Sequence, residues 1–431
     1  MGNKSENVKT SVSAPMTKDL LMKYTFVALV VIAATSAIAF GITALIITVI
    51  SLAVAVICDY LVSIVSRKKG LRDIYSSAVA GMIVALSFSS GIPYSAASPN
   101  FMMEPNMQYM AVAAISAITV IFFKKIQGLL GRKYVNPAAA AKLLALSPIY
   151  ATALIPTDHL VNIASSSGLK NAVTEMCYAH HEPIMGVTFN SPLADPLMTL
   201  TVLKNHGWLG GASSIAVIIV GIALIFFSRN YVKWKIPVTY LATVAVISAS
   251  YGFINGDDIV LRVAYHLFIG SSIFLAFFMA TDPATTPLTG VGQIIFAIGL
   301  AILTLVFQLY VQFLGGSILA LVIMNLMSPI LDRIGIQKPS ENRITKKLPK
   351  AKKFKSANLM NCIRCGKCMV SCCKNLSPIL IKEAADKGNW DRVKTLRADY
   401  CDSCGHCSYM CPSRIDLKGA VLNAKQKTEK A

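Results

Sequence analysis

The sequence predicts an all-α polytopic membrane protein with a small, helical, cysteine-rich domain at its C-terminus. Three observations support this fold class. The 431 residues are 55% hydrophobic and only 14% charged, with a mean hydropathy of +0.58, which is too apolar for an ordinary soluble enzyme. Ten apolar stretches can be marked, several near the ~20 residues that a helix needs to cross the hydrocarbon. Eight of the 11 cysteines fall in two runs within the last 70 residues.

The ten apolar stretches predict about ten transmembrane helices. A few are short or contain Gly and Pro, so nine or eleven spans also fit. Residues 1–23 are polar and mixed in charge, which does not indicate a cleavable signal peptide. The predicted spans are approximately 24–42, 43–65, 74–93, 109–123, 137–155, 213–228, 236–254, 262–281, 291–309 and 312–331.

The membrane body is predicted to be an internal duplication. VAGMIVALSFSSGIPYSAASP in the third span resembles FIGSSIFLAFFMATDPATTP in the eighth, and each ends in a Pro-rich loop, 91–99 or 281–289. With five spans per half, the second repeat must be inverted relative to the first, an arrangement that commonly builds sites near the bilayer midplane. Apolar helices can resemble one another by composition alone, but here the Pro and Ser positions match as well.

The distribution of Lys and Arg predicts the orientation. With the N-terminus inside, basic residues after spans two, four and six all lie in the cytoplasm, whereas the opposite loops hold Glu104, Asp257 and Asp258. Both termini are then cytoplasmic, a compartment that keeps thiols reduced. The basic residues are Arg67, Lys68, Lys69 and Arg72, then Lys124, Lys125, Arg132 and Lys133, then Arg229, Lys233 and Lys235.

The net charge of +20 is concentrated in the tail, where 22 Lys/Arg stand against 9 Asp/Glu from Asp332 onward. A basic linker lies directly after the last span. It either attracts anionic lipid or forms a docking face for an acidic electron donor such as ferredoxin. No nucleic-acid-binding motif accompanies the charge. The linker lysines are Lys346, Lys347, Lys350, Lys352, Lys353 and Lys355.

Each cysteine run reads Cys-x-x-Cys-x-x-Cys-x-x-x-Cys, the spacing that holds a [4Fe–4S] cluster. In two-cluster ferredoxins the fourth Cys of each run binds the other run's cluster. We therefore expect cluster 1 on Cys362, Cys365, Cys368 and Cys411, and cluster 2 on Cys401, Cys404, Cys407 and Cys372. Zinc sites usually show two Cys-x-x-Cys pairs instead, and disulfides need an oxidising compartment.

These features divide the chain into six predicted segments. A cytoplasmic N-terminal segment (1–23) precedes membrane repeat 1 (24–155), an extracytoplasmic loop (156–210) and membrane repeat 2 (211–332). A basic linker (333–356) then leads to a cytoplasmic domain for two clusters (357–431), whose short chain needs metal to fold. The connection between the repeats is too long for a simple turn and is expected to carry its own structure or a cofactor.

Several single residues have two interpretations. Asp59 and Asp282 are the ionisable residues nearest to membrane depth, which suggests ion binding, but Asp282 precedes Pro283 and can instead cap the following turn. Cys373 follows Cys372 directly and is either a bystander thiol or an alternative cluster ligand. Cys58 fits a small apolar residue, and Cys177 stands alone. His180 and His181 are either metal ligands or solvated loop residues.

Two stretches, FMATDPATTPLTGVGQIIFAIG (278–299) and KYVNPAAAAKLLA (133–145), carry a family resemblance. They resemble the membrane subunit shared by the Rnf complex (its D subunit) and the sodium-pumping NADH:quinone reductase (its B subunit), over residues 20–332. The Cys runs resemble the cytoplasmic tail of the Rnf C subunit, so the chain looks like a fusion. This resemblance implies FMN esterified to a Thr, and ion-coupled electron transfer between ferredoxin or NADH and an acceptor.

The flavin motif of that family is altered here. Ser191 in Val187-Thr188-Phe189-Asn190-Ser191-Pro192-Leu193 offers a hydroxyl where the acceptor Thr would be, but the acidic residue and the Gly-Ala pair are missing. A second element, Gly-Glu-Thr-Ser, is Gly211-Ala212-Ser213-Ser214, in which Ser213 is a further flavin-binding candidate. The resemblance thus leaves covalent FMN on Ser191, noncovalent FMN and no FMN as alternatives.

The sequence is most consistent with a membrane subunit of an Rnf-type complex. It would pass electrons from ferredoxin through its clusters to flavin and partner subunits, coupled to Na⁺ or H⁺ transport. No Gly-rich NADH-binding fingerprint is visible. The alternatives are a flavin-less membrane anchor carrying a cluster domain, and a redox-linked solute carrier.

Overall fold

The computed structural model of the chain describes ten stretches of residues and divides into two units. One unit comprises Met22–Ile334, and the other comprises Met1–Leu21 with Gly335–Ala431. The division after Ile334 lies two residues from the predicted start of the basic linker. The described residues are 16–65, 74–91, 105–127, 133–145, 201, 207–228, 231–268, 272–310, 316–340 and 362–430.

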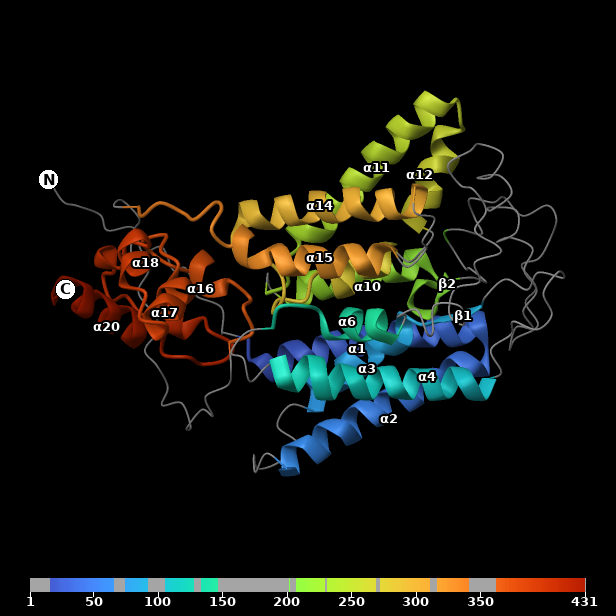
Figure 1. Ribbon diagram of the computed structural model, residues 1–431, viewed down its shortest axis with the longest axis horizontal. Helices are drawn as coiled ribbons and strands as arrows, with labels where there is room; N and C mark the ends of the chain where they lie inside the picture. Colours follow the sequence, from blue (N-terminus) through green and yellow to red (C-terminus); the bar gives the residue numbers. More distant parts are fainter. Residues whose placement is uncertain are drawn as a thin grey trace, which may run out of the picture. The chain divides into compact units, whose positions relative to one another are not determined.

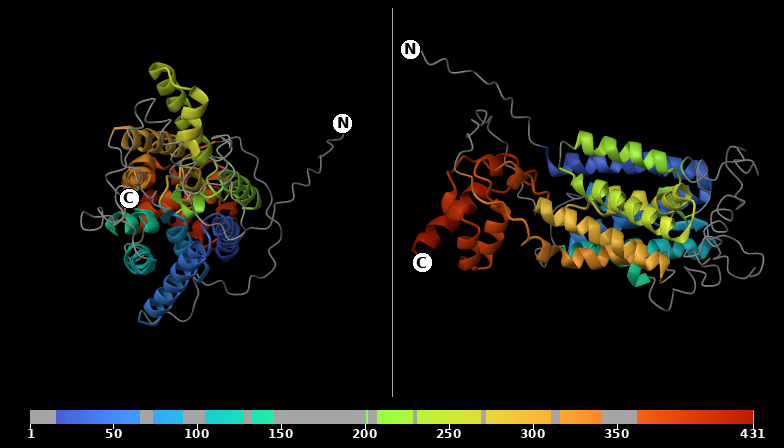
Figure 2. Two further views of the ribbon diagram at one scale, coloured as in Figure 1. Left: turned by 90° about the vertical axis from the view of Figure 1, so that its right-hand side faces the viewer. Right: turned by 90° about the horizontal axis from the view of Figure 1, so that it is seen from above.

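The first unit is a bundle of apolar helices (Figures 1 and 2). All ten predicted spans contain a helix. The first half holds α1 (Lys18–Phe40), α2 (Ile42–Val65), α3 (Ile74–Leu86), α4 (Pro105–Ile118), which continues as the π-helix η2 (Thr119–Ile126), and α6 (Pro137–Ala145). The second half holds α10 (Ser214–Phe227), α11 (Lys235–Asn255), α12 (Ile259–Phe268), α13 (Ser272–Phe274), the π-helix η6 (Leu275–Met279), α14 (Gly290–Leu309) and α15 (Gly316–Leu331).

Five of the described helices are long and apolar enough to cross a membrane, which makes the chain a polytopic α-helical membrane protein. The pair Ile259–Phe268 and Ser272–Met279, which bends by 55° at its break, is either a sixth, broken span or a re-entrant loop. Three shorter apolar helices, α3, α10 and α15, complete the set. The count of ten full crossings therefore remains a prediction. The five long helices are Lys18–Phe40, Ile42–Val65, Gln108–Ile126, Lys235–Asn255 and Gly290–Leu309.

Helix α2 shows how these helices meet both lipid and protein. Its outward face is apolar, with Val49, Ile57 and Ile64 each more than half exposed, as expected for a lipid-facing surface. Its inward face carries Ser51, whose hydroxyl donates to the Gly81 carbonyl of α3 at 2.7 Å. A Cβ on Gly81 would lie 2.8 Å from the Ala55 Cβ, so glycine permits this close helix crossing.

The two halves of the bundle share a packing pattern. Helix α2 packs against α3 and α4, and α11 packs against α12 and α14. Figure 1 shows α2 extending away from the bundle at the lower left and α11 extending away at the upper right. This arrangement is consistent with an inverted repeat, which remains a prediction.

The fourth span continues further than hydropathy indicated. The sequence analysis placed Lys124 and Lys125 in a loop after it, but both lie within η2, and Lys124 is buried. This placement was wrong because both lysines pair with Asp59 of α2 inside the bundle. Lys124 and Lys125 are therefore weaker indicators of the cytoplasmic side of the membrane than exposed loop lysines would be.

A short antiparallel strand pair joins distant parts of the first unit. β1 (Ser89–Gly91), just beyond α3, pairs with β2 (Gly207–Trp208), so that Ser89 faces Trp208. The 3₁₀ turn η4 (Leu209–Gly211) follows and leads into α10.

The second unit is a small helical domain. Its two longest connecting helices, α17 (Pro378–Asp386) and α18 (Trp390–Thr395), lie between the Cys runs. Lys18 at the start of α1 belongs to this unit, and its backbone N–H donates to the Pro412 carbonyl at 3.2 Å. The remaining elements are α16 (Lys367–Val370), η7 (Ala398–Tyr400), α19 (His406–Tyr409) and α20 (Leu417–Lys430).

Candidate iron–sulfur sites and buried polar sites

Each Cys run folds back on itself through left-handed backbone positions. Two residues after the first Cys, Arg364 has φ 53° and Ser403 has φ 61°. The glycines before α16 and α19, Gly366 and Gly405, have φ 73° and 78°, a conformation that glycine adopts without steric cost. These bends turn successive cysteines of a run toward one point.

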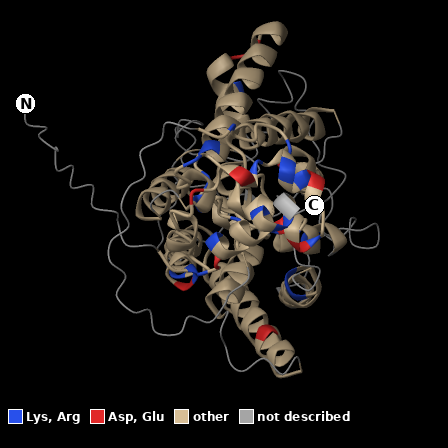
Figure 3. Cartoon of the chain, turned by 90° about the vertical axis from the view of Figure 1, so that its left-hand side faces the viewer, with Lys and Arg blue, Asp and Glu red and all other residues tan. Residues whose placement is uncertain are grey.

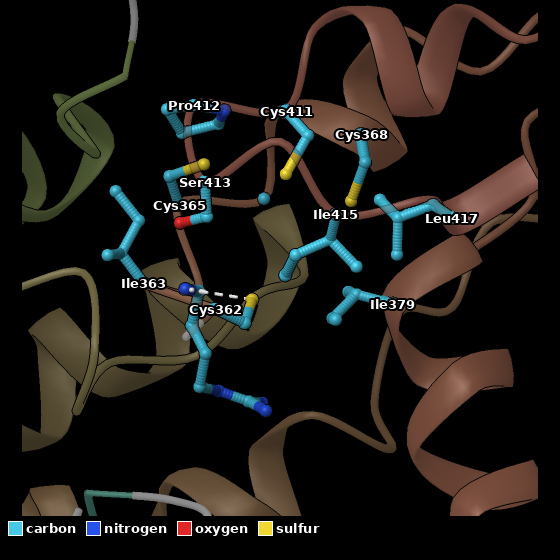
Figure 4. A pocket seen from close by; sticks show the side chains of 12 residues that line it. Cys362, Ile363, Cys365, Cys368, Ile379, Cys411, Pro412, Ser413, Ile415 and Leu417 are labelled. Carbon is cyan, nitrogen blue, oxygen red and sulfur yellow. Dashed lines mark hydrogen bonds between the residues drawn. The ribbon is translucent and has the colours of Figure 1, made fainter. Parts of the chain in front are cut away.

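The first pocket gathers three cysteines of the first run with one of the second. Cys362, Cys365 and Cys368 line it together with Cys411, and Ile363, Ile379, Ile415 and Leu417 supply apolar walls. Figure 4 shows the side chains of these four cysteines around one space. The residues present suit a group that takes four thiolate ligands in a largely apolar cage.

The second pocket has the reciprocal composition. Cys401, Cys404 and Cys407 of the second run line it with Cys372 of the first. The fourth Cys of each run therefore lies with the other run, which is the grouping expected from the spacing. Its rim is more polar than that of the first pocket, with Asp402, Lys374 and Lys418 among the lining residues.

Burial opposes ionisation of these thiols in the absence of metal. It raises the pKa of Cys407 to about 12 and, with the neighbouring thiols, holds the pKa of Cys368 well above its usual value. A bound metal would supply the positive charge that permits deprotonation, so metal binding and thiolate formation would be coupled. The donor set fits iron–sulfur clusters, and buried thiols of this kind can hold metal.

Backbone amides are directed at two of the sulfurs. The Arg364 N–H donates to Cys362 Sγ at 3.3 Å (dashed in Figure 4), and the Leu376 N–H donates to Cys372 Sγ at 3.3 Å. Each amide follows a left-handed bend or lies within it. Such hydrogen bonds stabilise negative charge on a ligand sulfur and are one determinant of cluster potential.

Cys373 lies close to the second pocket without lining it. Its Sγ, the Cys404 Sγ and a ring nitrogen of His406 all lie within 4.8 Å of one another. Burial, followed by the neighbouring Cys404, raises the pKa of Cys373 to about 11. The sequence analysis left this residue open between bystander and alternative ligand, and its position places it beside a predicted ligand.

Of the two flavin candidates, Ser213 is among the described residues and Ser191 is not. Cys177, His180 and His181 also lie outside the described residues. Ser213 is the N-cap of α10, where its hydroxyl accepts a hydrogen bond from the Ala216 N–H at 3.3 Å. This capping role accounts for a hydroxyl at position 213, and a flavin contact there remains a prediction.

Asp59, one of the two predicted ion-binding candidates, is a buried carboxylate. It lies 2.6 Å from Lys125 Nζ and 3.5 Å from Lys124 Nζ, and Lys124 also donates to the Ser77 hydroxyl of α3. The group thus links three helices and carries one more positive than negative charge. Such a cluster neutralises Asp59 within the membrane body.

Asp282 lies in a tight turn between η6 and α14. Its carboxylate accepts hydrogen bonds from the Ala284 N–H at 3.2 Å and the Thr285 hydroxyl at 3.4 Å. The same turn is held by Lys233, which donates to the carbonyls of Pro283 and Thr286. Ion binding by Asp282 remains a prediction beside this structural role.

A buried ion pair was not predicted from the sequence. Arg262 of α12 is fully buried and its Nε donates to Asp257 Oδ2 at 2.8 Å, whereas Asp257 had been counted only as a loop acid. Figure 3 shows that the projecting helices at the top and bottom of the view carry few charged residues. The signal in the sequence was an arginine within an otherwise apolar stretch.

The fold and the thiol pockets together define a redox membrane protein: a helical membrane body with a cysteine-rich unit that can hold metal. The chain belongs to the NQR2, RnfD, RnfE family, whose model matches residues 7–341. The two four-cysteine pockets lie beyond the matched segment.

Three relatives are D subunits of ion-translocating complexes. The chain is 28% identical to the D subunit of the Na⁺-translocating ferredoxin:NAD⁺ oxidoreductase complex of Acetobacterium woodii, over 73% of this chain and 87% of the relative. It is 28% identical to the D subunit of the proton-translocating ferredoxin:NAD⁺ oxidoreductase complex of Clostridium ljungdahlii, over 68% and 83%. It is 26% identical to the D subunit of the ion-translocating oxidoreductase complex of Halorhodospira halophila, over 74% and 92%.

Proposed function

We propose that this chain is the D-type membrane subunit of an ion-translocating, Rnf-type electron transport complex, with its own electron-entry domain attached. The observation that carries the proposal is the continuity of a family-matched membrane body with a unit holding two four-thiol pockets. Other subunits of such a complex are its partners, because its relatives are named as complex subunits.

Two [4Fe–4S] clusters fit the pockets best. Cys362, Cys365, Cys368 and Cys411 would hold the first, and Cys401, Cys404, Cys407 and Cys372 the second. A bound cluster supplies one-electron transfer at low potential. The chain's own contribution is to hold eight thiolates in apolar walls and to direct amide donors at Cys362 and Cys372.

Electrons would enter from a ferredoxin on the cytoplasmic side and pass toward flavin and partner subunits. Both termini are assigned to the cytoplasm, where thiols stay reduced. FMN remains part of the proposal for the membrane body, with covalent attachment through Ser191 or noncovalent binding as its two forms. The coupling ion is Na⁺ or H⁺, since relatives of each kind match.

The proposal is tested with the whole complex in sealed vesicles. Reduced ferredoxin should drive ion uptake in the wild type, and a chain carrying Cys404→Ser should lose that uptake while the complex still assembles. Uptake that survives the loss of cluster 2 would contradict an entry route through this chain.

A flavin-less anchor for the cluster domain is the second candidate. It is favoured by Ser213, whose hydroxyl caps α10 in the element that has lost the family's carboxylate. In-gel flavin fluorescence of the denatured protein distinguishes the two: fluorescence that disappears in Ser191→Ala supports covalent FMN. Full iron content with no flavin of either form supports the anchor.

A further inference from the structure

The two thiol pockets are near-duplicates in sequence and backbone. Both runs have Gly after the second Cys, and left-handed residues occupy matching places, including Asn375 and Arg414 three positions after each fourth Cys, with φ 54° and 53°. Because the two frameworks match, a difference between the pockets can be assigned to individual side chains.

Two side-chain differences lie next to each other, close to the second pocket. Pro412 follows the fourth Cys of one run and lines the first pocket, whereas Cys373 occupies the equivalent position in the other run. Lys367 follows Gly366, whereas His406 follows Gly405. At the first pocket, Pro412 and Lys367 therefore stand at the positions that Cys373 and His406 occupy at the second.

This pair reaches a cysteine that lines the second pocket. Cys373 Sγ lies 3.4 Å from His406 Nδ1, and Cys373 Sγ and a ring nitrogen of His406 lie within 4.8 Å of Cys404 Sγ. Cys373 and His406 are 7% and 6% exposed, so water competes little for these contacts. Proline at the equivalent position has no side-chain donor.

We propose that Cys373, held by His406, is a positioning residue that donates an S–H hydrogen bond to the Cys404 sulfur and raises the reduction potential of cluster 2. The inference rests on the proposed function, since it requires a cluster on Cys404. The ring Nδ1–H donates to Cys373 Sγ, and the Cys373 S–H donates onward to Cys404, so each contact holds one proton. A donor to a ligand sulfur favours the reduced, more negative cluster.

The test is an EPR-monitored redox titration of the full-length protein, purified anaerobically with iron analysis. Cys373→Ala removes the donor, and Cys373→Pro introduces the residue that stands at the first pocket. Both should lower the midpoint potential of cluster 2, leave cluster 1 unchanged and keep eight irons. His406→Ala, which removes the ring that holds Cys373, should lower it in the same direction.

A reciprocal graft gives an independent measurement. Pro412→Cys combined with Lys367→His places the pair beside Cys365, and the midpoint potential of cluster 1 should rise. Unchanged potentials in both Cys373 variants would overturn the inference. Loss of one cluster in Cys373→Ala would overturn it too, because Cys373 would then be a ligand. Wild-type protein without eight irons would instead refute the proposed function, before any variant is compared.

Discussion

At the scale of single residues, the exchange of the fourth cysteines is the most specific feature of the site. Cys411 lies with the first run and Cys372 with the second. The spacing of the runs predicted this grouping. The position of Cys373 beside Cys404 was beyond sequence reasoning, because it depends on how the two runs fold against each other.

Cys411→Ser should therefore remove the cluster held mainly by the first run, although the mutated residue belongs to the second. Iron content should fall by about half, because each cluster needs its four thiolates. EPR of the reduced protein identifies the remaining cluster, and Cys372→Ser is the matched control that should remove the other one. Loss of the same cluster in both variants would contradict the exchange.

Asp59→Asn should destabilise the membrane body. The change leaves Lys124 and Lys125 facing a neutral partner, with Lys124 7% exposed, and breaking a buried ion pair costs about 3–5 kcal/mol. Thermal unfolding in detergent should show a clearly lower Tm than the wild type.

The matched control is Asp258→Asn, the same chemical change at an exposed helix start. Asp258 Oδ1 accepts from the Val260 N–H at 2.9 Å, and Asn caps equally well. Equal Tm values for the two variants would show that the charge cluster around Asp59 contributes nothing measurable.

At the scale of elements, hydropathy located the described helices from α1 to α15 but not the interruptions within them. The predicted eighth span is broken between α12 and α13, and its last turns form the π-helix η6. Composition does not encode these breaks, because they depend on partners from distant elements. Lys233, which holds the turn at Pro283 and Thr286, had been counted as a loop charge for the same reason.

Asn136 is one such distant partner. Its Oδ1 accepts from the Ala138 and Ala139 N–H groups at the start of α6, and its Nδ2 donates to the Met279 carbonyl at 3.1 Å. Asn136→Ala should cost about 1 kcal/mol for the lost cap. It should cost a further ~0.5–1.5 kcal/mol for the lost hydrogen bond to the Met279 carbonyl, which still accepts from the Asp282 N–H at 3.4 Å. Asn136→Ser keeps a capping oxygen and should lose less, as measured by Tm. Equal losses would assign the whole effect to the bridge.

At the scale of the whole molecule, the two units should differ in their dependence on metal. The cysteine-rich unit is too small to bury a large core, so its folding should depend on its clusters, whereas the membrane body is stabilised by helix packing. After oxidative cluster removal and chelation, limited proteolysis of the full chain should cleave within 362–430 and spare α1–α15. Protection of both units would show that the tail folds without metal.

The central claim is that this chain carries electrons from a cytoplasmic donor into an ion-translocating membrane complex through two clusters. The most direct measurement is low-temperature EPR with iron, sulfide and flavin analysis of the anaerobically purified complex, before and after addition of reduced ferredoxin. The account predicts eight irons in this chain and the signals of two reduced clusters once ferredoxin is added. Clusters that dithionite reduces but ferredoxin does not, or a tail that holds zinc in place of iron, would contradict it.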